Sequence, residues 1–171
     1  MFELFWQRLD SGARQSLPFI TTLVCTLFSV VAWPLPHIGS IAPPLGLIVL
    51  YYWSIHRPDL LRPGMVFAIG LLNDALNSLP IGLSALLFVA VHQILFRQRR
   101  FFAGHSFFMM WFGFILMITG AMVTEWLALD LWNWHMMPFF PVLMQCILSI
   151  VIFPIPCWLL IRLQRATLTL N

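Results

Sequence analysis

Asp74 is the residue of this sequence whose type and position most clearly indicate chemistry. It lies in the apolar segment 64–78, roughly 15 Å along a helix that would begin at residue 64. A charged side chain placed at that depth in a membrane costs about 3 kcal/mol or more. Its neighbours on the same helical face are small or polar, namely Gly70, Asn77 and Ser78, and Asn73 borders this stripe. Such a stripe is expected to face another helix, a water-filled cavity or a partner protein.

Two interpretations of Asp74 remain open from the sequence. In the first, its carboxyl group contacts a partner or forms part of a functional intramembrane site. In the second, it forms hydrogen bonds with backbone or hydroxyl groups inside the helix bundle and only holds the helices together. Glu125 is expected near the outer end of a later helix as an interfacial carboxylate, and His92 is expected to reach the cytoplasmic headgroups.

Signatures of enzymes and cofactors are lacking in the sequence. It contains no G-x-S-x-G or H-E-x-x-H motif, no glycine-rich phosphate loop and no lysine. Histidines and cysteines show no metal-type spacing, and Cys25, Cys146 and Cys157 are interpreted as buried apolar thiols. The sequence therefore predicts neither catalytic residues nor a cofactor, and its dispersed arginines argue against nucleic-acid binding.

The elements that must position these residues follow from composition and charge. Hydrophobic residues make up 61% of the 171 residues and charged residues 9%, against about a quarter in soluble domains. All nine basic residues are arginines, and they fall in four short polar stretches between long apolar segments. Because cationic loops stay on the cytoplasmic side, this pattern predicts a polytopic, all-α membrane protein with both termini in the cytoplasm.

Six transmembrane helices are predicted within one membrane domain that covers residues 1–171. The spans are 17–33, 41–55, 64–78, 82–96, 106–129 and 138–161. Residues 1–16 are expected to form an amphipathic segment at the cytoplasmic interface, and 162–171 a cytoplasmic tail. Spans two to four have only about 15 residues, fewer than the roughly 20 needed to cross a bilayer. They must therefore extend further, thin the bilayer or be sheltered by longer helices.

Two local features constrain how these helices pack. The turn at Pro80, Ile81 and Gly82 leaves room only for a tight hairpin, so the third and fourth helices should be antiparallel neighbours. Gly82 is expected to need a backbone conformation that larger residues avoid. Pro154 and Pro156 should kink the sixth helix.

The central segment, residues 43–95, resembles the family of the bacterial rod-shape-determining protein MreD. The resemblance rests on an ordered set of residues: Pro44, Leu47, Tyr52, Trp53, Pro58, Phe67, Gly70, Asp74, Leu79, Gly82, Ala85 and Leu86. Pro80 departs from the pattern, since relatives more often have a small or polar residue there.

The resemblance implies a non-enzymatic subunit of the cell-elongation machinery in the bacterial inner membrane. It implies binding to the bitopic protein MreC, and an indirect link to the actin-like MreB, the polymerase RodA and its transpeptidase partner. It further implies a fold similar to the S components of energy-coupling-factor transporters. The alternative function is therefore a small-molecule carrier or substrate-binding component, built around Asn73, Asp74, Asn77, Glu125 and Gln145. An enclosed polar pocket would favour the carrier, and an exposed stripe or groove the scaffold.

Overall fold

The computed structural model describes residues 16–29, 42–102, 107–133 and 138–168, in which every regular element is helical. The amphipathic segment expected at residues 1–16 lies almost wholly outside this part of the chain. The helices are an N-terminal helix Ser16–Ser29, α2 (Leu45–His56), α3 (Pro63–Leu76), α4 (Leu83–Phe102), α5 (Phe107–Asn133), α6 (Phe139–Ile152) and α7 (Pro154–Leu168), with a short 3-10 helix at Pro58–Leu60. This confirms the all-α expectation.

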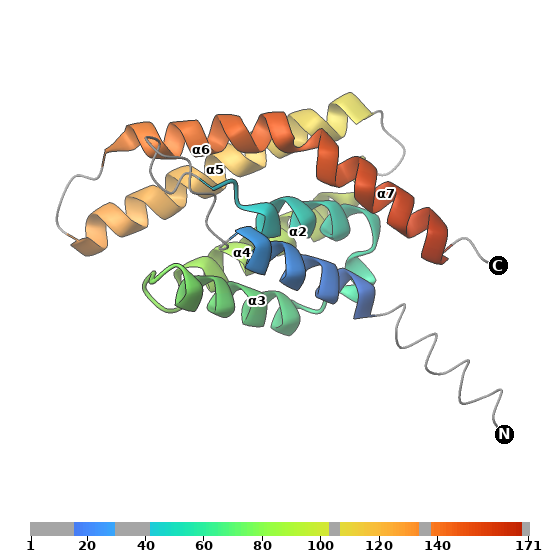
Figure 1. Ribbon diagram of the computed structural model, residues 1–171, viewed down its shortest axis with the longest axis horizontal. Coiled ribbons are helices and arrows are strands. Elements are labelled where there is room, and N and C mark those ends of the chain that lie inside the picture. The colour runs from blue at the N-terminus through green and yellow to red at the C-terminus, as the bar shows by residue number, and fades with distance from the viewer. Residues whose placement is uncertain (1–15, 30–41, 103–106, 134–137, 169–171) are drawn as a thin grey trace, which may run out of the picture.

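Helix α2 forms the centre of the molecule. Figure 1 shows it in the middle of the view, with α5 and α6 along one edge and the N-terminal helix and α3 on the opposite side, while α4 packs against both α2 and α5. Every residue from Gly46 to Ile55 is buried, as expected for a helix that is apolar on all sides. A Cβ atom at Gly46 would overlap the hydroxyl of Thr26, so the N-terminal helix packs closely against α2.

The lengths of the helices agree only in part with the predicted spans. Helices α2 and α3 have 12 and 14 residues, so their predicted shortness is confirmed, and α2 is sheltered by its neighbours. Helix α4 continues to Phe102 instead of ending at residue 96, because glutamine and arginine are good helix formers and no glycine or proline interrupts the segment. Helix α7 likewise continues to Leu168, past the predicted end at residue 161.

Two stretches are long and apolar enough to cross a membrane, the second only if a bent pair of helices counts as one span. Phe107–Trp132 is long and apolar enough by itself. Phe139–Ile152 reaches the required length only together with Pro154–Gln164, from which it is separated by a bend of 42°. The kink predicted from the prolines is therefore confirmed. Pro154 has no N–H, so it cannot bond the carbonyl of Ile150 as a helical residue would. The indole N–H of Trp111 on α5 donates to that carbonyl instead, at 3.3 Å.

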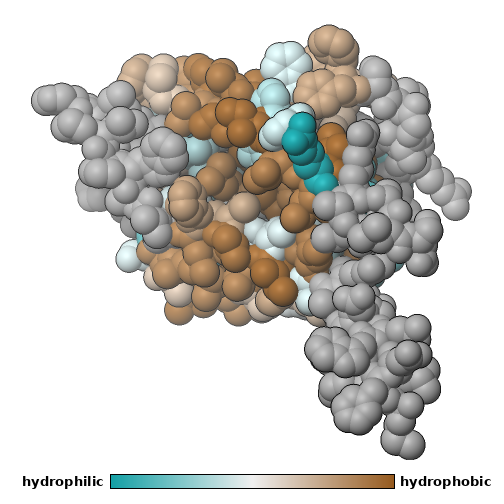
Figure 2. Space-filling view, turned by 45° about the vertical axis from the view of Figure 1, so that its right-hand side comes forward, coloured by the Kyte–Doolittle hydropathy of each residue, from teal (hydrophilic) through white to brown (hydrophobic). Residues whose placement is uncertain are grey.

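The outer surface carries many large apolar side chains. Phe108, Phe112 and Leu116 on α5 are each more than 70% exposed, and Figure 2 shows hydrophobic residues over most of the described face. Apolar patches of this extent are unusual on monomeric proteins in water. This surface is suited to lipid or to partner helices.

Candidate functional site

The Asp74 carboxylate lies fully buried between α3 and the start of α4. Its Oδ1 accepts a hydrogen bond from the backbone N–H of Ser84 at 2.8 Å, and its Oδ2 accepts from Gly82 at 2.8 Å and from Ala85 at 3.4 Å. The first N–H groups of a helix have no partner inside the helix. A side chain at the N-cap usually binds them, but the residue there is glycine. Asp74 of the neighbouring helix performs this capping instead.

The two helices of the hairpin approach each other closely at Gly70. A Cβ atom at this position would collide with the Cα atom of Ala85 and lie 2.8 Å from its backbone nitrogen. Asn73, one turn further on, donates from Nδ2 to the hydroxyl of Ser84 at 3.1 Å. Of all the helix pairs in the described chain, α3 and α4 have the most extensive contact. The prediction that they are adjacent is confirmed.

The predicted polar stripe divides at the end of α3. Helix α3 ends at Leu76 rather than at Ser78, and Ser78 adopts a positive φ of 55° beyond it. Asn77 is exposed and donates from Nδ2 to the backbone oxygen of Asn73 at 2.9 Å and to its side-chain oxygen at 3.1 Å. Of the candidate residues, Gly70, Asn73 and Asp74 thus face α4, whereas Asn77 is at the surface of the turn.

Gly82 holds the turn in a conformation that suits glycine. Its φ is +103°, a region that residues with a Cβ atom rarely adopt. A Cβ atom there would meet nothing within 4 Å, so the constraint comes from the backbone and not from crowding. This conformation directs the N–H of Gly82 at Asp74.

We expect Gly82→Val to lower the amount of folded protein in the membrane several-fold, because forcing valine into this region costs about 1 to 3 kcal/mol. Ile81→Val in the same turn is the matched control, since Ile81 is 84% exposed. Membrane abundance of both variants, measured by quantitative immunoblotting, tests this. Equal amounts of the two proteins would show that the turn tolerates a side chain at Gly82.

Four consecutive residues of α2, the segment Tyr51 to Ser54, bond to four different helices. The hydroxyl of Tyr51 donates to the carbonyl of Met110 on α5, and that of Tyr52 to Gln164 on α7, both at 2.8 Å. The next two bonds join Trp53 to Thr21 of the N-terminal helix at 3.0 Å and Ser54 to His92 of α4 at 2.8 Å. These residues therefore connect the elements around the central helix.

This arrangement corrects the expectation for His92. Its side chain does not reach toward headgroups but is 2% exposed, and it bonds both Ser54 and the backbone of Leu61. The reason is the position of α2, which offers a polar partner inside the bundle. The sequence did carry a signal, because four residues with side-chain donors follow one another in an otherwise apolar segment.

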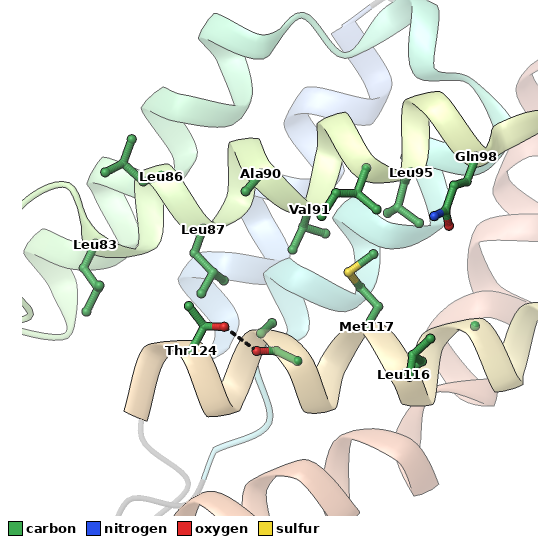
Figure 3. Close-up of a pocket in the computed structure, with 14 residues that line it drawn as sticks. Leu83, Leu86, Leu87, Ala90, Val91, Leu95, Gln98, Leu116, Met117 and Thr124 are labelled. Carbon is green, nitrogen blue, oxygen red and sulfur yellow. Dashed lines mark hydrogen bonds between the residues drawn. The ribbon is translucent and has the colours of Figure 1, made fainter. Parts of the chain in front are cut away.

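An open, apolar groove runs between α4 and α5, with a volume of about 530 Å³. Figure 3 shows Leu87, Val91 and Leu95 of α4 directed toward Met117 and Thr124 of α5. Small residues of α5 also line it, namely Gly113, Gly120 and Ala121. The only polar side chains of the lining are Thr124, whose hydroxyl donates to the carbonyl of Gly120, and Gln98. The groove is thus suited to an apolar occupant.

The remaining polar candidates do not converge with Asp74 on one cavity. Glu125 and Gln145 line a separate pocket of about 200 Å³ between α5 and α6. Gln145 also donates from Nε2 to the carbonyl of Ala42 at 2.8 Å. The enclosed polar site expected of a carrier is therefore not assembled from these residues in the described chain.

The fold and its polar contacts define an all-helical protein with an apolar outer surface, in which the buried polar residues Ser54, Asp74, Ser84 and His92 join helices to one another. The family model of the rod shape-determining protein MreD matches residues 12–163. The chain therefore belongs to the MreD family, a family of membrane proteins involved in determining rod shape. Neither the curated proteins nor the solved structures compared with it gave a match.

Proposed function

We propose that this chain is a multi-pass, non-enzymatic subunit of the cell-elongation complex in the bacterial inner membrane. In this role it binds MreC, and through it links the MreB filament to RodA and its transpeptidase partner. Family membership supports a role in rod shape. The observation that supports the finer proposal is the groove between α4 and α5, which is apolar and open as a surface for a partner helix would be, and is not an enclosed polar site.

The proposed topology has six spans and cytoplasmic termini. Helices α6 and α7 together form the last span, and α2 and α3 are too short to cross an average bilayer alone. Shelter by longer helices lets such short elements lie at membrane depth, because their backbone groups are already bonded internally.

We expect reporters inserted at Leu79 and Asp130 to be periplasmic, and those at Leu60 and at the C-terminus to be cytoplasmic, because all the arginines fall on the latter side. A paired alkaline phosphatase and fluorescent-protein fusion at each site measures this. A periplasmic C-terminus would rule out six spans.

We propose that the groove receives the single transmembrane helix of MreC. Its lining on α4 extends from Leu83 to Gln98, which corresponds to roughly 22 Å of helix. In lipid, helices associate through close packing over small residues, since no hydrophobic effect drives them together. Gly120 provides such a place, because a Cβ atom there would meet nothing within 4 Å. The fold itself therefore does not require glycine at this position.

Gly120→Phe is expected to reduce the MreC recovered with the purified protein about tenfold while leaving its abundance unchanged, because the ring would occupy the groove. Gly64→Phe is the matched control, since Gly64 also has nothing within 4 Å but lies on α3. Co-purification from membranes, normalised to the amount of tagged protein, measures both. Undiminished MreC with Gly120→Phe would place the contact elsewhere.

The alternative, a small-molecule carrier, has weaker support. The larger cavity is apolar and open along the bundle, and the polar residues assigned to a carrier site are separated. A carrier would bind its substrate without MreC. Ligand-dependent stabilisation of the purified chain alone would favour it.

A further inference from the structure

Glu125 is a carboxylate without a partner in the described part of the chain. It is partly buried on α5, and no described residue forms a hydrogen bond or an ion pair with it. Because no fully buried side-chain oxygen of the described chain lacks a partner, its oxygens are open to the pocket. Asp74, whose negative charge acts on Glu125, is already bonded by backbone N–H groups. A partly buried charge is costly when it is not compensated. Glu125 thus differs from Asp74 in offering carboxyl oxygens to a donor from another molecule.

No arginine of the described part of α4 lies close to this carboxyl group along the chain, and α5 contains none. Arg97 is near the end of α4, and α5 begins only a few residues later at Phe107. Glu125 lies 18 positions beyond Phe107, roughly 27 Å along α5. No arginine or lysine occurs between Arg100 and Arg162 in the sequence. Residues 101–161 therefore supply no arginine or lysine of their own, and a cation from another molecule can bind there.

The pocket around Glu125 has the chemistry of a site for an organic cation. Besides Glu125, its polar lining is Gln145, whose oxygen has no hydrogen bond in the described structure. The pocket's volume of about 200 Å³ is several times the space of one water, about 30 Å³. Its walls are apolar and aromatic: Met122, Trp126, Leu129, Pro138, Pro141 and Val142. No group of three metal-ligating side chains occurs among the described residues, so an ion held by protein ligands alone does not fit.

The surroundings of the pocket favour a lipid as the source of this cation. Leu127, Leu131 and Phe140 near it are each more than half exposed, as is Trp132 at 70%. Tryptophan is enriched at the depth of lipid headgroups, and Trp126 itself lines the pocket and packs edge-on against Phe139. A lipid whose acyl chains cover the exposed apolar residues would have its headgroup at this level.

We propose that Glu125 and Gln145 bind the primary ammonium group of a zwitterionic phospholipid, as in phosphatidylethanolamine. The ammonium offers three N–H donors, as a lysine side chain does. The carboxylate oxygens of Glu125 and the side-chain oxygen of Gln145 accept them. The proposal holds for either leaflet, and it does not depend on MreC.

The test uses the purified full chain in vesicles of phosphatidylglycerol alone or mixed with phosphatidylethanolamine or phosphatidylcholine. Thermal unfolding is followed by intrinsic fluorescence, and lipids retained by the protein are counted by native mass spectrometry. We expect phosphatidylethanolamine to raise the unfolding temperature and to be retained about tenfold over phosphatidylcholine, whose headgroup nitrogen has no N–H. Glu125→Gln should lose this preference. Asp130→Asn, the matched control, removes a charge outside the pocket and should keep it.

Several results would overturn the proposal. The first is equal retention of the two zwitterionic lipids by the unaltered protein. The second is a Glu125→Gln variant that keeps the preference for phosphatidylethanolamine. The same stabilisation by free ethanolamine in phosphatidylglycerol vesicles would assign the pocket to a soluble amine. Loss of a co-purified protein from Glu125→Gln, with lipid retention unchanged, would assign the cation to a partner's basic side chain.

Discussion

Asp74→Ala is expected to remove most of the folded protein from the membrane and to turn rods into rounder cells. The substitution leaves the N–H groups of Gly82, Ser84 and Ala85 without their acceptor. Each unsatisfied buried group costs about 1 to 3 kcal/mol, and the Asp74 side chain is fully enclosed, so water does not readily replace the carboxylate. A decrease of several kcal/mol in the free energy of unfolding lowers the cellular abundance of a protein at least several-fold. Immunoblotting of membranes together with cell-shape imaging measures both effects.

Asp74→Asn tests whether both carboxylate oxygens are needed. The amide keeps one acceptor but presents an NH₂ group where the second oxygen accepted an N–H, so at least one donor at the start of α4 would face another donor. We expect the membrane abundance of Asp74→Asn to lie between that of Asp74→Ala and that of the unaltered protein. Asn77→Ala is the control in the same hairpin, because Asn77 is exposed and, within the described residues, its side chain bonds to Asn73 alone.

The outcome of these variants also distinguishes the two interpretations of Asp74. The carboxylate is fully buried and its oxygens are occupied, so we propose that it affects partners indirectly, by fixing α3 against α4. Asp74→Ala would then lose MreC only in proportion to the protein lost. Normal abundance combined with loss of MreC would contradict this and support direct contact with a partner.

Features that depend on neighbouring residues could be predicted from the sequence. The antiparallel hairpin follows from the short turn before Gly82, and the bend in the last helix pair follows from Pro154. The need for glycine at position 82 was also predictable, because it concerns one residue's backbone. The ends of the helices were predicted less accurately. Arginines indicate a membrane boundary, but they also form helix readily, and α4 therefore extends to Phe102.

Features that depend on tertiary packing could not be predicted in this way. The sequence indicated that Asp74 faces a partner, but whether that partner is a backbone, a cavity or another protein depends on where α4 begins in space. His92 was assigned to the interface because its distance from the helix end was known and its contact with Ser54 was not. The small residues of α5 were visible as a stripe, yet the groove requires α4 beside them.

Gly70→Ala is the second substitution for which we expect a large effect, because the added Cβ atom would collide with the backbone of Ala85. Backbone atoms cannot rotate away as a flexible side chain can, so α3 and α4 must separate. The contact between the helices would then be lost together with the hydrogen bonds of Asp74 to the start of α4. We expect membrane abundance to fall several-fold, as for Asp74→Ala.

Gly64→Ala and a double variant show whether the close approach is the cause. Gly64 lies on the same helix with nothing within 4 Å, so alanine there should be neutral, or stabilising by up to about 1 kcal/mol through its higher helix propensity. Ala85→Gly should not rescue Gly70→Ala, because the collision involves the Cα and backbone nitrogen of residue 85 and not its side chain. Thermal unfolding of the purified variants in one detergent measures all three. Rescue by Ala85→Gly, or equal destabilisation by Gly64→Ala, would show that the distance between the helix backbones at Gly70 does not limit stability.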